Sequence, residues 1–168
     1  MKQALFIGRF QPFHLGHLSV VKKAIKEFDR VIIGIGSAED SFLPDNPFTA
    51  SERFQMIEAA LGEAGIPAEK HCIAPVRNIL NYELWPDHVD QIVPPYEAVL
   101  TGSKLVKTLF QNQGKHKIID VKFEHDICST DVREKMLQDK GWQSMVPSAV
   151  AKLIEKFDGI TRIKNIQK

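Results

Sequence analysis

Short apolar runs of strand length alternate with segments of helical periodicity along this 168-residue chain. The runs cover residues 4–7, 31–35, 72–76, 98–101 and 118–121. Each run is mostly apolar and lacks regularly alternating polar positions, which is typical of strands covered on both faces in a parallel sheet. The alternation therefore predicts an α/β fold, with an open parallel sheet of about five strands and helices on both faces.

Two helices have clear signals in the first half of the chain. The first has an apolar stripe at Leu18, Val21, Ile25 and Phe28. The second begins at a capping box formed by Thr49 and Glu52, in which each side chain can bond the other residue's backbone N–H. We expect its buried face to consist of Phe54, Ile57 and Leu61.

The organisation predicts one domain over residues 1–168, with a C-terminal helical segment from about 130 to 158. Within that segment, Pro147 suits the first turn of a helix and Gly159 suits its end. Residues 37–47 and 78–95 lack helical periodicity, so we expect irregular loops there. Loops at strand ends commonly carry substrate contacts in such folds.

Composition excludes several classes of partner. The net charge of +1 predicts no broad basic surface for nucleic acid. No apolar run approaches the ~20 residues that span a bilayer, and the chain opens on a strand pattern rather than a leader. Cys72 and Cys128 are far apart and form no CxxC pair, so we expect neither a disulfide framework nor a bound zinc ion. A cytoplasmic location fits these features.

Residues 8–17, GRFQPFHLGH, follow the first apolar run directly and open the first helix. The N-terminus of a helix offers free N–H groups and partial positive charge to an anion. Arg9, His14 and His17 add donors at the same place, and Gly16 leaves room for a ligand near the backbone. The segment therefore predicts a phosphate-binding loop; the alternative is that both histidines only cap the helix or pack locally.

A second candidate anion site lies at residues 129–133. Ser129 and Thr130 can cap a helix, and Arg133 follows one turn later. Two hydroxyl groups, free helix N–H groups and a guanidinium together suit a terminal phosphate. An ordinary capped helix is the alternative.

These motifs resemble those of a known family. His14-Leu15-Gly16-His17 resembles the HxGH signature of a nucleotidyltransferase superfamily, and the longer segment from Gly8 is similar to archaeal-type nicotinamide-mononucleotide adenylyltransferases. Ser129, Thr130 and Arg133 resemble the superfamily's second signature, and residues 36–38 with 46–53 resemble a third family pattern. The resemblance implies a Rossmann-like sheet of the nucleotidyltransferase type and the reaction ATP + nicotinamide mononucleotide → NAD + pyrophosphate.

The resemblance also implies roles for individual residues. The implied catalytic residues are Arg9, His14 and His17. The implied ATP-binding residues are Gly8, Phe10, Gly16, Gly102, Ser129, Thr130 and Arg133. The implied nicotinamide-nucleotide-binding residues are Gly36, Ser37, Asn81 and Trp85. Mg²⁺ would arrive with ATP rather than in a dedicated metal site, and relatives of this type form trimers or hexamers.

Some positions leave alternatives open. Asp45 stands where relatives commonly have a basic residue, so that contact is absent or comes from Lys104 or Arg77. Arg53 suits a buried pair as well as a ligand contact, and Trp85 suits core packing as well as ring stacking. The basic tail, Arg162, Lys164 and Lys168, suggests solvated turns, with contact to a neighbouring subunit as the alternative.

Other functions also stay open. The same chemistry could serve nicotinate mononucleotide, phosphopantetheine or FMN as acceptor. Relatives acting on the last two typically carry Gly-Thr-Phe-Asp in the first loop, unlike residues 8–11 here. A nucleotide sensor without catalysis is the remaining alternative, although such a protein would be expected to lose a histidine or Arg133.

Overall fold

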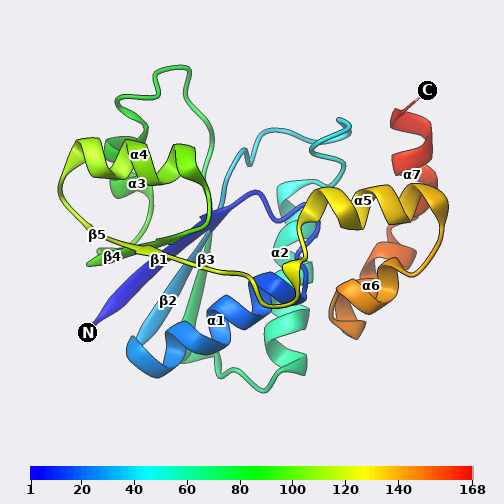
Figure 1. The fold of residues 1–168 in the computed structure, drawn as a ribbon, viewed down its shortest axis with the longest axis horizontal. Helices are drawn as coiled ribbons and strands as arrows, with labels where there is room; N and C mark the ends of the chain where they lie inside the picture. Colours follow the sequence, from blue (N-terminus) through cyan, green and yellow to red (C-terminus); the bar gives the residue numbers. More distant parts are fainter. Residues whose placement is uncertain (168) are drawn as a thin grey trace.

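The centre of the molecule is a parallel sheet of five strands in the order β3-β2-β1-β4-β5 (Figure 1). This computed structural model describes residues 1–167, apart from the side chain of His125, so Lys168 lies outside the described residues. The strands are β1 (Gln3–Gly8), β2 (Arg30–Ile35), β3 (His71–Pro75), β4 (Ala98–Thr101) and β5 (Lys117–Asp120). Their bounds differ from the predicted runs by at most one residue at either end.

Each face of the sheet has its own apolar core. Along β1, Ala4 and Phe6 belong to one core, while Leu5 and Ile7 belong to the other. This alternation follows from the two-residue period of a strand. Both faces of the central strands are buried, which confirms the prediction drawn from their continuous apolar runs.

Helices cover both faces, as predicted. Figure 1 shows α3 (Trp85–Ile92) and α4 (Lys104–Gln113) on one side, with α1 (Leu15–Glu27) and α2 (Ala50–Glu63) on the other. Three more helices pack beyond α2: α5 (Ser129–Gln138), α6 (Ser148–Lys156) and α7 (Gly159–Ile166). The short 3₁₀ helices are η1 (Ala68–Lys70), η2 (Glu124–Asp126) and η3 (Trp142–Met145). None of the helices within residues 1–167 is long and apolar enough to cross a membrane.

The capping box that begins α2 is confirmed, but its predicted buried face is partly wrong. Thr49 Oγ1 accepts from Glu52 N–H, and Glu52 Oε2 accepts from Thr49 N–H. Ile57 and Leu61 are buried as expected, whereas Phe54 is 41% exposed and Arg53 is fully buried. The arginine takes the inward position because backbone carbonyls there satisfy its guanidinium.

Two helix boundaries also correct the sequence analysis. Residues 78–95, expected to be irregular, contain α3, because Pro86 lies in the first turn where a missing N–H costs nothing. The C-terminal helical segment continues beyond residue 158 to Ile166. Gly159 begins α7 instead of ending α6, and the left-handed conformation falls on Asp158, with φ 54°.

The sheet order determines where a site can form. The chain moves from β1 to β2 and β3 on one side, then returns to place β4 and β5 on the other side of β1. Ligands of such sheets bind beyond the carboxyl ends of the strands where the order reverses. The loops that follow β1 and β4 meet at this point.

Candidate functional site

Two cavities meet at the carboxyl end of β1. The first, of about 370 Å³, extends from Phe6 to His17 on one side and to α5 on the other; we name it the histidine pocket. The second, of about 510 Å³, extends toward α3 and α4; we name it the tryptophan pocket. Both are lined by Ile7, Gly8, Arg9 and Ser103. A ligand in one pocket can therefore reach a ligand in the other at the tip of β1.

His14 and His17 form a reciprocal capping box at the start of α1. His14 N–H donates to His17 Nδ1 at 3.2 Å, and His17 N–H donates to His14 Nδ1 at 3.3 Å. An Nδ1 that accepts a hydrogen bond carries a lone pair, so a neutral ring must hold its proton on Nε2. Capping and catalysis thus do not exclude each other, because the cap fixes each imidazole with Nε2 as a donor.

Burial keeps both imidazoles neutral. His14 is 1% exposed and His17 is 8% exposed, and their rings stack with centroids 3.5 Å apart. Burial lowers the pKa of His14 to about 4, although the charge of Asp131 opposes this shift. Burial, and then the neighbouring His14, hold the pKa of His17 well below its usual value. Both rings are therefore neutral N–H donors at pH 7 in the ligand-free protein.

Gly16 also has a packing role. A Cβ atom at this position would lie 3.0 Å from the His14 ring and 3.1 Å from Phe123 Cβ. Both contacts are closer than most side-chain contacts in a packed interior. The missing side chain thus makes room for the His14 imidazole and for Phe123.

The second motif places Arg133 against the first loop. Its Nη1 donates to Gln11 O at 3.0 Å, and its Nη2 donates to Asp45 Oδ1 at 3.1 Å. Ser129 Oγ donates to Pro12 O at 3.2 Å. Neither Ser129 nor Thr130 is the cap of α5: Cys128 holds that position and makes no side-chain capping bond within the described residues. The first-turn N–H groups of α5 are thus left without a side-chain cap at the edge of the histidine pocket.

Asp45, which stands where relatives commonly have a basic residue, therefore forms an ion pair with Arg133. Its carboxylate is 73% exposed, whereas the arginine side chain is 9% exposed. Burial lowers the pKa of Arg133, and the charge of Asp45 opposes that shift. As the structure describes them, Lys104 and Arg77 are not among the residues that line either pocket.

Arg53 holds the two strand tips together from inside the protein. Its guanidinium donates to five backbone carbonyls at 2.8 to 3.4 Å, those of Arg9, Gly36, Ser37, Asp40 and Thr49. Phe10 and Ser37, beside these carbonyls, have left-handed backbones with φ of 52° and 46°. Such conformations are costly for residues other than glycine and persist only where neighbours fix them. Burial lowers the pKa of Arg53 to about 10, so it stays charged at pH 7.

The tryptophan pocket contains three of the four residues expected there. Gly36, Ser37 and Trp85 line it. Trp85 is 9% exposed and packs edge-on against Phe110 at 5.8 Å, so it serves the core and the pocket together. Asn81 is not among the lining residues: its Oδ1 accepts from Glu83 N–H and Leu84 N–H in the turn before α3.

Eight of the residues named from sequence line the histidine pocket: Gly8, Arg9, Phe10, His17, Gly102, Ser129, Thr130 and Arg133. His14 lies behind His17 rather than on the lining. Sequence reasoning missed the lining residues Phe123, Asn78 and Leu105. Asn78 and Phe123 lie in the loops that follow β3 and β5, and Leu105 lies in the first turn of α4. Their positions just beyond the carboxyl ends of the strands could have identified them.

A metal ion at this site would be coordinated mainly by the bound substrate and by water rather than by protein side chains. Among the residues that the structure describes, no group of three His, Cys, Asp or Glu side chains is arranged to hold a metal ion. Asp131, in the first turn of α5 beside Thr130, is the carboxylate adjacent to the histidine pocket in sequence. Such a donor set fits a cation that keeps water and phosphate oxygens in its shell, as Mg²⁺ does.

Comparisons with known proteins agree with this geometry. Residues 5–135 match the Cytidylyltransferase-like family. A nicotinamide-nucleotide adenylyltransferase of Methanolobus tindarius is 41% identical over 100% of this chain and 96% of its own length. One from Thermococcus sibiricus is 42% identical over 96% of this chain and 88% of its own length.

Solved structures give the same result. A bifunctional NMN adenylyltransferase/ADP ribose pyrophosphatase from Francisella tularensis superposes with a TM-score of 0.84 at 27% identity, covering 98% of this chain. This chain spans about half of that protein, 52% of its length. A second structure of the Francisella protein, complexed with AMP and an Mn ion, gives a TM-score of 0.82, again at 27% identity, over 98% of this chain and 51% of that one.

Proposed function

The chain belongs to the Cytidylyltransferase-like family and, within it, to the nicotinamide-nucleotide adenylyltransferases, and we propose that its two pockets bind the two substrates of that reaction. ATP would place its phosphates in the histidine pocket, and nicotinamide mononucleotide would occupy the tryptophan pocket. The observation that carries this proposal is the meeting of both pockets at Gly8 and Arg9, where two nucleotides can be joined.

The reaction is an in-line displacement at the α-phosphorus of ATP. A 5′-phosphate oxygen of nicotinamide mononucleotide forms a new P–O bond, while the bond to the β-phosphate oxygen breaks and pyrophosphate leaves. The attacking phosphate is already ionised at pH 7, so no general base is required. Catalysis then depends on positioning and on stabilising charge in the transition state.

Neutral imidazoles suit that task. His17, and His14 behind it, would donate from Nε2 toward the α-phosphate oxygens as negative charge accumulates. The capping bonds hold both rings, so they need not reorganise during the reaction. Arg9, which lines both pockets, would neutralise the facing phosphates of the two substrates.

The leaving pyrophosphate would be held at α5. Ser129, Thr130 and Arg133 line this end of the histidine pocket beside the uncapped first turn of α5. The N-terminus of a helix favours an anion at this place. Gly8, Phe10 and Gly102 would shape the same pocket around ATP. The bond from Arg133 to Asp45 would then yield to a phosphate or be shared with it.

The tryptophan pocket would recognise the pyridine nucleotide. Trp85 offers an aromatic face to the nicotinamide ring, and Gly36 and Ser37 lie at the tip of β2 close to Gly8. Asn78 takes the place in this pocket that the sequence suggested for Asn81.

A divalent cation, Mg²⁺ in this proposal, would arrive with ATP and neutralise its phosphates. Asp131 could contact its water shell. The Francisella structure with AMP and an Mn ion supports the use of a divalent cation by a relative. A trimeric or hexameric assembly, a cytoplasmic location and the lack of nucleic-acid binding stay predictions.

Product analysis tests the proposed function. The protein would be incubated with ATP and Mg²⁺ and, in parallel, with nicotinamide mononucleotide, nicotinate mononucleotide, phosphopantetheine or FMN, and the products separated by chromatography. We expect NAD and pyrophosphate in equal amounts from the first mixture. Product only from phosphopantetheine or FMN would reassign the acceptor, and no product from any mixture would favour a non-catalytic nucleotide sensor.

A further inference from the structure

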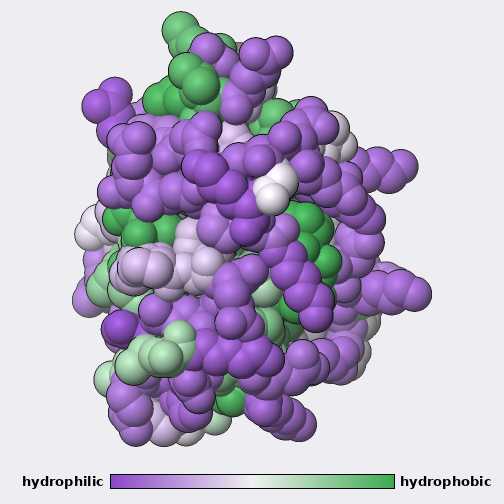
Figure 2. Space-filling model, turned by 90° about the vertical axis from the view of Figure 1, so that its left-hand side faces the viewer, coloured by the Kyte–Doolittle hydropathy of each residue, from purple (hydrophilic) through white to green (hydrophobic). Residues whose placement is uncertain are grey.

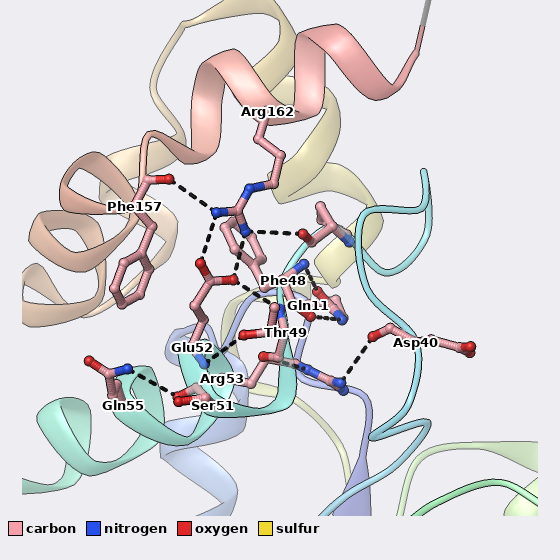
Figure 3. Close-up of polar contacts among 11 residues, drawn as sticks. Gln11, Asp40, Phe48, Thr49, Ser51, Glu52, Arg53, Gln55, Phe157 and Arg162 are labelled. Carbon is pink, nitrogen blue, oxygen red and sulfur yellow. Dashed lines mark hydrogen bonds and ion pairs between the residues drawn. The ribbon is translucent and has the colours of Figure 1, made fainter.

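An arginine on α7 contacts the segment that pairs with the first loop of the site. Arg162, on α7, lies between α2 and residues 42–48, far in sequence from both phosphate-binding motifs (Figure 3). The basic tail was expected to be solvated, yet the Arg162 side chain is only 17% exposed. This burial indicates a specific role.

Arg162 makes a two-pronged ion pair with Glu52. Its Nη1 and Nη2 donate to Glu52 Oε2 and Oε1 at 2.6 and 2.8 Å. The same guanidinium donates to Pro47 O at 3.3 Å and to Phe157 O at 3.2 Å. Burial would raise the pKa of Glu52, but hydrogen bonds from Arg162 and Thr49 outweigh it and lower the pKa. Arg162 therefore fixes both the start of α2 and the segment before it.

That segment leads directly to the first loop. Phe48 is fully buried, and its backbone pairs with the Gln11 side chain: Gln11 Nε2 donates to Phe48 O and Phe48 N–H donates to Gln11 Oε1, both at 2.9 Å (Figure 3). Gln11 O in turn accepts from Arg133 Nη1 at 3.0 Å. A continuous path thus runs from Arg162 through the Pro47–Phe48 backbone and Gln11 to Arg133.

Close packing reinforces this path. A Cβ atom on Gly159, the first residue of α7, would lie 2.9 Å from Phe48 Cε1, so only glycine lets α7 approach that ring. The guanidinium of Arg162 also lies 4.7 Å from the Phe42 ring centroid and 5.8 Å from that of Phe48. Residues 42–48 are therefore held between α7 and the first loop.

The apolar contacts of α7 do not require this arginine. Ile163 is 3% exposed and belongs to the core that joins α5, α6 and the sheet, and Ile160 packs against the same core, so α7 has apolar contacts that do not involve Arg162. What Arg162 adds is the placement of Phe48. We propose, on the basis of the proposed function, that Arg162 is a positioning residue for Gln11 and Arg133 and thereby for the triphosphate of ATP.

Steady-state kinetics of Arg162→Ala test this role. We expect the KM for ATP to rise about tenfold, since one set of charge-assisted bonds is lost along the path. The KM for nicotinamide mononucleotide and kcat should each stay within about threefold of the wild-type values. Neither the tryptophan pocket nor the two imidazoles lie on the path from Arg162 to Arg133. Arg162→Lys should restore part of the ATP affinity, since it keeps the charge without the two-pronged geometry. Lys164→Ala, on the same helix with an exposed partner in Asp139, is the matched control and should leave both KM values unchanged.

A double-mutant cycle with Gln11→Ala separates positioning from a loss of stability. If Arg162 acts through Gln11, adding Arg162→Ala to Gln11→Ala should raise the KM for ATP no further. Fully additive effects, an unchanged KM for ATP, or equal rises for both substrates would each overturn the proposal. The wild-type protein in the same assay tests the proposed function independently, because failure to form NAD there would refute the function and not this role.

Discussion

The two pockets on either side of Gly8 are built differently. The histidine pocket is formed by buried groups with bonded partners: stacked imidazoles that cap each other, Arg133 on Gln11 O, and Phe10 held in a left-handed backbone. The tryptophan pocket is bordered by residues 78–84, where Leu80, Tyr82 and Leu84 are each more than half exposed. Figure 2 shows apolar side chains gathered at the top of the molecule, where the segment before α3 lies in Figure 1.

This contrast follows from the tasks proposed for each pocket. Stabilising charge in a transition state requires hydrogen-bond donors that are fixed before the reaction. Donors that had to reorient during the reaction would lose part of that stabilisation to reorganisation energy. Holding a substrate ring requires contact area and an entrance, which an exposed loop can supply. We therefore expect substitutions of the imidazoles in the histidine pocket to change turnover or stability, and substitutions around the tryptophan pocket to change the affinity for nicotinamide mononucleotide.

The largest expected effect is acid destabilisation caused by His14. Its pKa of about 4 in the folded protein lies below the ordinary value of 6.5, so the unfolded chain binds the proton more readily between these values. Stability should therefore fall as the pH is lowered from 6.5 to 4, by about 3 kcal/mol from this residue. Urea unfolding at several pH values measures this. His14→Asn, which can still cap α1, is the control, and an unchanged pH dependence in that variant would contradict the assignment.

His17→Ala should reduce turnover next most strongly. We expect kcat to fall ~10²-fold or more with a modest change in ATP binding, because one fixed donor to the transition state is lost. Steady-state kinetics together with calorimetric ATP binding measure the two effects. His88→Ala, on α3, is the matched control. Near-normal turnover in the His17 variant would remove this imidazole from catalysis and leave it only as a cap.

Trp85→Phe should alter the other pocket by a smaller amount. The smaller ring offers less stacking area, so the KM for nicotinamide mononucleotide should rise about three- to tenfold. The KM for ATP serves as the internal control and should not change. Equal rises for both substrates would mean that Trp85 only packs against Phe110 and supports α3.

Leu80→Ser should have the smallest effect. Leu80 is fully exposed, so we expect kinetic constants within about twofold of wild type and a free energy of unfolding within about 0.5 kcal/mol. Kinetics and urea unfolding again provide the measurements. A marked rise in the KM for nicotinamide mononucleotide would show instead that residues 78–84 close over the bound ring, and the contrast between the pockets would then weaken.

Much of the fold was predictable because local sequence patterns determine where its strands lie and where one helix begins. The apolar runs gave all five strands within one residue, and the Thr49–Glu52 capping box marked the start of α2. The buried face of α2 was not predictable in the same way. Arg53 is polar in any local pattern, and only carbonyls from two separate loops, those after β1 and β2, make its burial favourable. Helix α3 was missed because its Trp-Pro start resembles a loop.

The candidate site shows the same division between local pattern and tertiary contact. Residues 8–17 and 129–133 were predicted to be phosphate-binding elements from their own chemistry, and the structure brings both to the histidine pocket. Their partners were not, since Asp45 on Arg133 and Arg162 on Glu52 join residues 88 and 110 positions apart. Nothing in a local window distinguishes such an arginine from a solvated one.

The sequence by itself determined the alternating strands and helices, the two candidate anion-binding motifs and the family, because these depend on residues that are neighbours along the chain. Only the tertiary structure decided that Gly16 makes room for Phe123, that Arg53 supports two strand tips and that α7 contacts the segment paired with the first loop. Each of these depends on which distant groups fill the space around a side chain. Close packing determines that outcome across the whole molecule, and no short segment encodes it alone.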